Sequence, residues 1–151
     1  IAIAVNLREM AKLETPIIAV ITGEGCSGGA LGLGVANRVF MLEHSYYTVI
    51  SPEGCASILW RSADMASTAA EALKITANDL LNMGIIDGII KEPLGGAHYN
   101  PEFTAKSITE TIMKALDDLS GMSGQALKDD RYNKFRKMGV FIENQLENYH
   151  E

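Results

Sequence analysis

Residues 17–33 join an apolar, branched run to a glycine-rich bend and the start of a helix. The run Ile17–Ile21 is nearly all branched, as expected for a strand that is buried on both faces of a largely parallel sheet. Four glycines then remove side chains where the backbone turns: Gly23, Gly25, Gly28 and Gly29. Their N–H groups are left uncovered at a helix start, where the helix dipole adds positive charge. The sequence therefore predicts a strand–turn–helix unit that holds a phosphate, a carboxylate or a developing oxyanion.

Three kinds of site fit this spacing. Residues 23–28 spell G-x-G-x-x-G, the dinucleotide-binding fingerprint, and Glu43 ends the next expected strand, about where a ribose-binding acid would lie. Residues 25–29 spell G-x-S-x-G, the nucleophile elbow of serine hydrolases. In the third kind, the amides of Gly28 and Gly29 form an oxyanion hole without a nucleophile. The structural alternative is a tight turn in which the glycines allow close packing.

The neighbouring sequence disfavours the first two kinds of site. A dinucleotide-binding domain normally begins with its fingerprint strand, whereas residues 1–13 show the apolar spacing of an amphipathic helix. A nucleophile at Ser27 needs a base, and the sequence ties none of the three histidines to it: His44, His98 and His150.

Alternating helices and strands are expected along the rest of the chain. Further helices are expected over 28–36, 55–61, 66–74, 77–83, 102–119 and 127–138, and strands over 38–42, 46–50 and the segment before Ile90. Gly32 and Gly34 in the first of these helices require close approach to other backbone. Tyr47 and Val49 are expected to share one face of their strand.

The ends of several helices have sequence signals. Thr76 is expected to cap the helix 77–83 and Gly84 to end it. Gly121 and Gly124 are expected to break the chain before the last helix, whose basic face is interpreted as solvated or part of an interface. Residues 142–151 are expected to form a polar, frayable end.

The composition fits an intracellular globular piece. The chain is 47% hydrophobic and 21% charged, and its 151 residues are enough for one domain with a moderate core. Cys26 and Cys55 are too few and too isolated for a disulfide framework or a metal site, which favours a reducing compartment. The net charge of −6 argues against nucleic acid as a primary partner. The sequence has no apolar run of ~20 residues that would predict a membrane span.

Three motifs resemble one family: residues 24–32 (EGCSGGALG), 51–60 (SPEGCASILW) and 92–101 (EPLGGAHYNP). They closely resemble the carboxyltransferase alpha subunit of bacterial-type acetyl-CoA carboxylase. The resemblance runs nearly end to end, from the NLREMAKLETPI segment to the C-terminal RYNKFRKMG. The family often has glycine where this chain has Cys26, so this chain adds a small side chain in the turn.

The resemblance implies an α/β, crotonase-like (ClpP/crotonase) fold, a spiral of ββα units with C-terminal helices. Residues 1–121 would be the C-terminal part of a crotonase-like carboxyltransferase domain, and residues 122–151 a C-terminal helical extension. Because the family's alpha subunit has a further N-terminal region, the chain is expected to be a C-terminal fragment. Alone it is expected to lack a complete site, to be inactive and to expose apolar sheet edges.

The resemblance also implies a reaction, the transfer of a carboxyl group from carboxybiotin to acetyl-CoA to form malonyl-CoA for fatty acid synthesis. The N–H groups of Gly28 and Gly29 would be the catalytic oxyanion hole, facing the ureido oxygen of biotin. Further substrate-binding candidates are Gly25, Cys26, Ser27, Glu53 and His98. Glu53 also fits the first turn of a helix after Ser51, where an acid favours the dipole. Leu31 stands where crotonase-family hydratases have one of two glutamates, which argues against hydratase chemistry.

The expected partners follow from the resemblance as well. They are a carboxyltransferase beta subunit in an alpha2-beta2 heterotetramer, a biotin carboxyl carrier protein that carries the biotin, and biotin carboxylase. No metal is expected in this chain, since the zinc of this enzyme class belongs to the beta subunit. The expected location is the cytoplasm, or the plastid stroma in a plant or alga. Two alternatives stay open: a ClpP-like serine hydrolase that uses Ser27, and an incomplete, non-catalytic assembly fragment.

Overall fold

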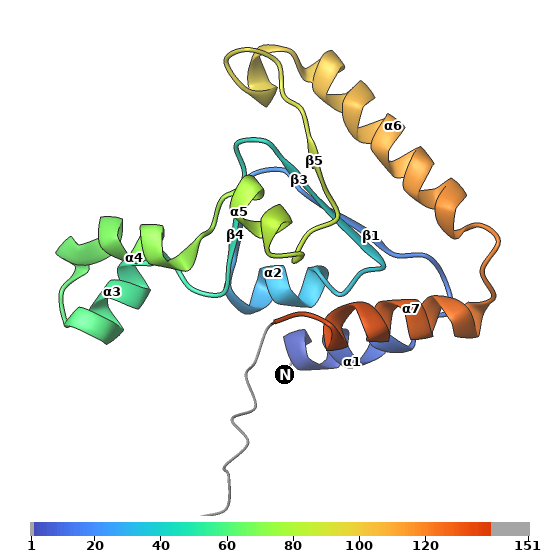
Figure 1. The fold of residues 1–151 in the computed structure, drawn as a ribbon, viewed down its shortest axis with the longest axis horizontal. Coiled ribbons are helices and arrows are strands. Elements are labelled where there is room, and N and C mark those ends of the chain that lie inside the picture. Colours follow the sequence, from blue (N-terminus) through green and yellow to red (C-terminus); the bar gives the residue numbers. More distant parts are fainter. Residues whose placement is uncertain (1, 140–151) are drawn as a thin grey trace, which may run out of the picture.

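The computed structural model of the chain describes residues 2–139 and shows two small parallel sheets surrounded by helices (Figure 1). The strands are β1 (Ile18–Ile21), β2 (Glu24–Cys26), β3 (Arg38–Leu42), β4 (Tyr46–Thr48) and β5 (Gly88–Ile90). The α-helices are α1 (Ala2–Lys12), α2 (Ser27–Leu33), α3 (Pro52–Trp60), α4 (Ala66–Leu73), α5 (Ala77–Asn82), α6 (Pro101–Leu119) and α7 (Gly124–Arg136). Two 3₁₀ helices are η1 (Ala63–Met65) and η2 (Ala97–Tyr99).

The strands and helices form two similar turns of a spiral. The first turn consists of β1, β2 and α2, and the second of β3, β4 and α3. β3 pairs in parallel with β1, with Ile18 opposite Arg38, and β4 pairs in parallel with β2, with Glu24 opposite Tyr46. Each turn therefore adds one strand to each sheet, although the sequence itself shows no repeat.

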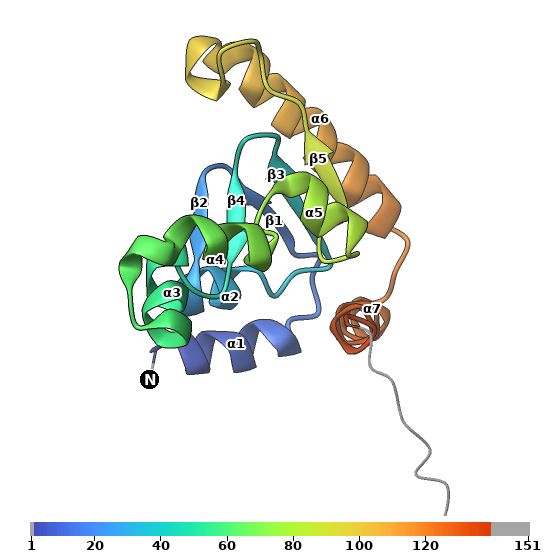
Figure 2. The same cartoon turned by 60° about the vertical axis from the view of Figure 1, so that its left-hand side comes forward.

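The main core lies on one face of the sheet formed by β1, β3 and β5. Val39 and Met41 of β3 are buried there together with Ala77 and Leu80 of α5. Side chains alternate across a strand, so Leu42 belongs to the opposite face, where it is also buried. On that side α6 packs against β1 and β5. Figures 1 and 2 both place β5 between α5 and α6.

The expectation that the run 17–21 is buried on both faces is wrong. The four residues of β1 are only half-buried, whereas β3 contains three buried residues. The reason is position, because β1 lies at the edge of its sheet and β3 lies in the middle. The branched run correctly predicted a strand, but its composition did not reveal that the strand lies at an edge.

Most element boundaries agree with the periodicity, and the expected signals at the two ends of α5 are confirmed. The Thr76 side chain accepts a hydrogen bond from the backbone N–H of Asp79, and Gly84 adopts a left-handed φ of 70°. The strand expected over 46–50 is shorter in the structure: β4 ends at Thr48, and Val49 after it is 74% exposed. Tyr47 and Val49 therefore do not share a buried face.

Two helix starts differ from expectation. α3 begins at Pro52 rather than at residue 55, because Ser51 caps it by accepting a hydrogen bond from the N–H of Gly54 at 3.1 Å. Gly124 does not break the chain but begins α7, where Ser123 accepts a hydrogen bond from the N–H of Ala126. In both cases a serine cap determines where the helix begins.

α7 is attached to the body by a buried guanidinium, so the interpretation of this helix as solvated or part of an interface was incomplete. Arg131 is 2% exposed and donates hydrogen bonds to the backbone oxygens of Leu13 and Thr15 and to Oδ1 of Asn37. Asn37 in turn donates from Nδ2 to the carbonyl of Leu127 at 2.9 Å. The contacts join α7 to the segment after α1 and to the start of β3. The predicted frayable end over 142–151 lies outside the described residues.

Candidate functional site

α2 begins directly after β2, and Ser27 makes the turn between them. Ser27 has a φ of 62°, in the left-handed region that non-glycine residues seldom adopt. Cys26 before it is extended and makes no side-chain hydrogen bond to the helix start. The first N–H groups of a helix have no carbonyl four residues earlier in the same helix to bond. Gly28 and Gly29 carry two of these N–H groups.

The two glycines differ in what surrounds them. A Cβ atom at Gly29 would meet nothing within 4 Å, and the residue is exposed. A Cβ atom at Gly28 would lie 3.5 Å from the side chain of Ile3 in α1. The walls of the three hollows described below do not include Gly28 or Gly29. The first turn of α2 therefore has α1 beside Gly28 and free space beside Gly29.

Gly32 and Gly34 have side chains, not the backbone of another element, as their nearest neighbours. A Cβ at Gly32 would lie 3.3 Å from Ile3, and a Cβ at Gly34 would collide with the hydroxyl of Tyr47. The expected close approach is confirmed, but the expected backbone partner is wrong. The glycines make room for Ile3 and Tyr47.

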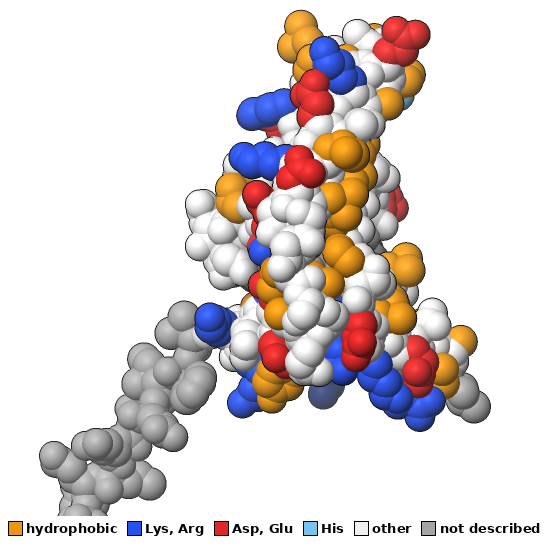
Figure 3. All heavy atoms as spheres, turned by 90° about the vertical axis from the view of Figure 1, so that its right-hand side faces the viewer, with side chains coloured by type: hydrophobic (Ala, Val, Ile, Leu, Met, Phe, Trp, Pro, Cys, Tyr) orange, Lys and Arg blue, Asp and Glu red, His pale blue; other side chains and the backbone are white. Residues whose placement is uncertain are grey.

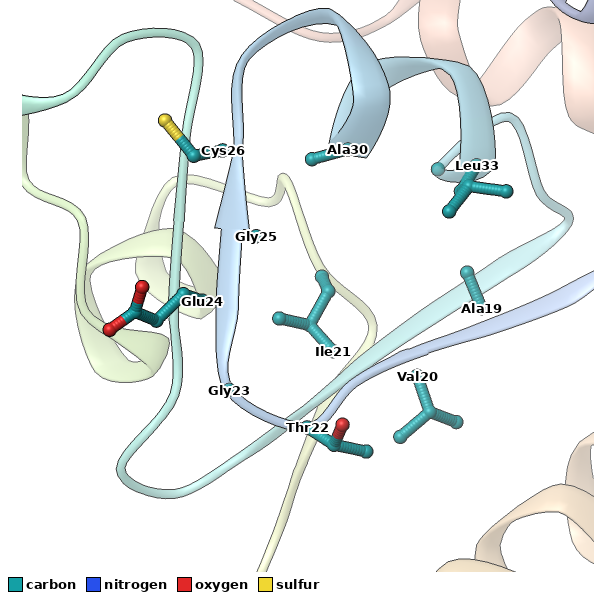
Figure 4. A pocket seen from close by; sticks show the side chains of 11 residues that line it. Ala19, Val20, Ile21, Thr22, Gly23, Glu24, Gly25, Cys26, Ala30 and Leu33 are labelled. Atoms are coloured by element: carbon teal, nitrogen blue, oxygen red, sulfur yellow. The ribbon is translucent and has the colours of Figure 1, made fainter.

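A hollow of about 340 Å³ lies beside this turn, between β1, β2 and α2 (Figure 4). Gly25 and Cys26 line it, together with Ile21 and Ala30. Figure 4 shows the side chains of Glu24 and Cys26 on one side of β2 and that of Ile21 on the other. Glu24 and Cys26 share a side because side chains alternate along a strand. The Cys26 thiol is thus directed away from the apolar side of the hollow.

The side of β2 with Glu24 and Cys26 gathers several ionisable groups around Tyr46. Partial desolvation raises the pKa of the Tyr46 phenol, and the carboxylate of Glu24 opposite it raises that pKa further. The charges of Cys26 and Glu53 also act on this phenol in the same direction. The structure therefore brings the candidates Cys26 and Glu53 near one tyrosine that the sequence did not single out.

Glu53 itself occupies the first turn of α3 and is exposed. This confirms the structural interpretation, since an acid in the first turn stabilises the helix dipole next to the Ser51 cap. Ser27 lines a different hollow of about 360 Å³, whose walls are mainly apolar and include Leu31, Tyr47 and Phe135. The residues that line this hollow include no histidine, aspartate or glutamate that could serve Ser27 as a base.

His98 lies in a separate hollow of about 500 Å³, with Thr22, His44 and Glu92. The hollow shares Thr22 with the one beside β2, at the opposite end of that strand from Gly28. The extended chain from Thr22 to the end of β2 covers roughly 10–13 Å. The structure therefore brings Gly25, Cys26, Ser27, Gly28 and Gly29 together, and it places His98 in a second location.

The carboxylate of Glu92 holds this second location together. Its side chain is 6% exposed and accepts hydrogen bonds from the backbone N–H of His44 at 2.6 Å, from Nδ1 of His44 at 2.8 Å and from the N–H of Ala97 at 2.9 Å. Burial raises the pKa of Glu92, but the hydrogen bonds from His44 and Ala97 outweigh burial and leave that pKa below its ordinary value. Sequence reasoning missed this pair because the two residues are 48 positions apart.

Among residues 2–139, no group of three or more histidine, cysteine, aspartate or glutamate side chains is arranged to hold a metal ion. The helices described between residues 2 and 139 include none with the length and apolarity needed to span a membrane.

Comparison with known proteins gives consistent matches. The family described as "Acetyl co-enzyme A carboxylase carboxyltransferase-like" matches residues 1–139. The chain is 58% identical over 142 residues to a protein of Synechococcus elongatus and 57% identical over 142 residues to one of Protochlamydia amoebophila. A protein of Thermus thermophilus is 52% identical over 141 residues. All three are named acetyl-coenzyme A carboxylase carboxyl transferase subunit alpha.

The chain spans less than half of the length of these relatives. The matches to the Synechococcus elongatus and Protochlamydia amoebophila proteins cover 94% of this chain but 43% and 45% of the relatives. The match to the Thermus thermophilus protein covers 93% of this chain and 45% of that protein.

Solved structures show the fold. A Pseudomonas malonate decarboxylase hetero-tetramer in complex with coenzyme A has a TM-score of 0.66 at 17% identity, covering 89% of this chain and 54% of that chain. Transcarboxylase 12S has a TM-score of 0.60 at 18% identity, covering 97% and 26%. An enoyl-CoA hydratase from Mycobacterium avium has a TM-score of 0.52 at 19% identity, covering 86% and 53%. The two turns of the spiral are thus part of a crotonase-like fold, as the sequence resemblance implied.

Proposed function

Because the chain belongs to the acetyl-CoA carboxylase carboxyltransferase family, we propose that it forms the C-terminal part of an alpha subunit of that enzyme. In this function the alpha subunit helps to transfer a carboxyl group from carboxybiotin to acetyl-CoA, which gives malonyl-CoA for fatty acid synthesis. The agreement of the family match over residues 1–139 with the fold supports the proposal.

The observation that carries the chemistry is the first turn of α2. Gly28 and Gly29 have N–H groups that the helix does not use, and the space beside Gly29 is open to a ligand. Carboxybiotin, when bound, supplies the carboxyl group and a ureido oxygen on which negative charge develops. Donors fixed in advance stabilise that charge more than the neutral ground state, and one such donor contributes about 3–4 kcal/mol in other enzymes.

The other candidates take supporting roles in this proposal. Gly25 lets β2 pass close to Tyr47, since a Cβ there would lie 3.0 Å from that ring. Cys26 and Ser27 form the turn that aims the two amides. Glu53 lies near Tyr46 on the same side of the β2–β4 pair. His98 is proposed as a more distant substrate contact from the second hollow.

The proposed assembly is that of the relatives' enzyme class. A beta subunit of the same fold completes the active site in an alpha2-beta2 heterotetramer, and biotin arrives on its carrier protein after carboxylation by biotin carboxylase. No residue of this chain is proposed to attach biotin. The cytoplasm, or the plastid stroma in a plant or alga, is the proposed compartment. The open first turn of α2 agrees with a site that a second subunit covers.

The test is a block at the open glycine. In the full-length subunit, reconstituted with its beta partner, Gly29→Val fills the space beside the amides without touching α1. We expect the rate of malonyl-CoA-dependent carboxylation of biocytin to fall by about 100-fold or more. The valine side chain would keep the ureido oxygen away from the amides, and loss of one oxyanion donor has an effect of this size.

The matched control is Gly121→Val, at a glycine where a Cβ also meets nothing within 4 Å. Both variants should keep the melting temperature and the assembly of the parent. Full activity of Gly29→Val would refute the oxyanion role. Labelling of Ser27 by a fluorophosphonate would instead favour the serine hydrolase.

A further inference from the structure

The second hollow lies at the carboxyl ends of the three parallel strands. Thr22 directly follows β1, His44 lies two residues after β3, and Glu92 lies two residues after β5. Ligands of open parallel sheets bind outside this edge, because the loops that leave the strands converge there. The loop with Gly95, Gly96, Ala97 and His98 closes the other side of the hollow.

Glu92 fixes the geometry of the hollow, and most of its hydrogen-bonding capacity is already used within the chain. Its carboxylate is almost fully buried and already accepts three N–H groups, two from His44 and one from Ala97. Such a carboxylate ties the corner between β3 and β4 to the loop that carries His98. The hydrogen bonds also satisfy the charge, as a buried charge requires.

The same contact determines the tautomer of His44. An ionised carboxylate only accepts hydrogen bonds, so Nδ1 of His44 must carry the proton that Glu92 receives. In the neutral ring Nε2 is then an acceptor. The His44 side chain is 68% exposed and lines the hollow, so this acceptor is accessible to a ligand there.

The charges around the hollow are balanced. Lys91, next to Glu92, forms an ion pair with Glu43 at 2.6 Å. Glu92 is compensated by the three N–H donors described above. Each of these charges is therefore already paired within the chain, and none is left to attract a ligand of opposite charge. A neutral ligand with a hydrogen-bond donor matches what the walls offer: the His44 acceptor, the Thr22 hydroxyl and the His98 ring.

We propose that this hollow is a second binding site, which takes a neutral amide by accepting its N–H at Nε2 of His44. Only the choice of candidate ligands rests on the proposed function. They are the pantetheine arm of an acyl-CoA and the amide that links biotin to a lysine. The site itself follows from the geometry of His44 and Glu92. It is separate from the amides of Gly28 and Gly29, at the opposite end of β2.

The first measurement is the tautomer of His44. Long-range ¹H–¹⁵N NMR of the full-length subunit labelled at histidine should show the proton on Nδ1 of His44. In Glu92→Gln the anionic acceptor is lost, and a mixture of tautomers should replace the single form. The matched control is Glu71→Gln, at an exposed glutamate of α4, which should leave the His44 signals unchanged. A proton on Nε2 of His44 in the parent chain would overturn the proposal.

The second measurement is a titration with pantetheine and, separately, with biocytin. Amide signals of Thr22, Gly95 and Gly96 should shift with at least one of the probes, and the probe that shifts them identifies the source. The dissociation constant of that probe should increase about tenfold in His44→Phe, which keeps an aromatic ring but has no acceptor. If neither probe shifts these signals, or if His44→Phe binds as tightly as the parent, the site is refuted. None of these results depends on carboxyl transfer, so the proposed function is tested separately.

Discussion

Ser27 combines a position in the proposed site with an unfavourable backbone conformation. A left-handed conformation costs an L-residue roughly 1–2 kcal/mol relative to glycine, which adopts it freely. Ser27 holds this conformation at φ 62° so that the chain can pass from β2 into α2 without a loop. The turn keeps the next two amides outside the helix ladder. Residues in such conformations are concentrated at functional sites.

Replacing Ser27 with glycine should therefore stabilise the chain. We expect Ser27→Gly to raise the free energy of unfolding by about 0.5–1 kcal/mol, since relief of the left-handed conformation exceeds the entropy that glycine loses on folding. Urea denaturation of the two chains measures the difference. Ser27→Val is the opposing control and should be destabilised, because a branched residue is least suited to this conformation. A loss of stability in Ser27→Gly would mean that the serine side chain has a stabilising role that its contacts do not show.

Glu92 should make stability depend on pH in a defined direction. Its pKa in the folded chain lies below the ordinary value of 4.5, so the unfolded chain binds the proton more tightly than the folded chain does. The contribution of Glu92 to stability is complete above about pH 4.5 and is lost as the pH falls through the folded value. We expect the unfolding free energy of Glu92→Gln to fall less steeply below this pH than that of the parent. Equal slopes in urea titrations between pH 3 and 6 would contradict the assignment.

At the level of elements, α7 depends on one buried arginine. Arg131 bonds two backbone oxygens and Asn37, and its Nε is buried without a hydrogen-bond partner. We expect Arg131→Met to lower the free energy of unfolding by about 3 kcal/mol, because the acceptors would lose hydrogen bonds from a charged donor. The control is Arg136→Met at the exposed end of the same helix, where a change within about 0.5 kcal/mol is expected. Equal effects of both substitutions would show that Arg131 does not anchor α7.

The elements could largely be predicted from the sequence because their signals are local. The 3.6-residue and twofold periodicities placed α1, α6 and β3 to within one or two residues, and the Thr76 cap was identified from neighbouring residues. The contacts between distant segments could not be predicted. Arg131 and Asn37 are 94 positions apart, so nothing near either residue indicates that they meet. The same limit explains why the run 17–21 was expected to be buried on both faces, since its place in the sheet depends on pairing with distant strands.

The candidate site was predictable in part for the same reason. The glycine bend is a local motif, and the structure places its five candidates, Gly25 to Gly29, at the junction of β2 and α2. Tyr46 joins the site through the pairing of β4 with β2, and that register depends on the spiral as a whole. His98 belongs to a loop whose position is determined by Glu92 and His44. Motifs therefore identified residue types, and the topology determined which of them lie together.

The whole molecule exposes apolar surface in several places. Figure 1 shows α3 and α4 projecting from the body as a pair, and Ile58 and Leu59 of α3 are 72% and 64% exposed. Figure 3 shows hydrophobic side chains in a band down the face where α6 lies, and Phe103 and Met113 of that helix are 43% and 53% exposed. Such patches on a protein surface indicate contact with other chains or association of like chains.

The isolated chain should therefore associate with itself. Charged side chains introduced on the α3–α4 pair should weaken this association most directly. The double variant Ile58→Glu, Leu59→Glu adds two charges at positions that contribute little to the core, so its free energy of unfolding should stay within about 0.5 kcal/mol of the parent. Sedimentation velocity should show the dissociation constant for self-association increasing by at least tenfold, because burial of the charges would oppose contact. Ser67→Glu, at an exposed polar residue of α4, is the matched control and should associate as the parent does. If the double variant associates as strongly as the parent, α3 is not the surface that joins the copies.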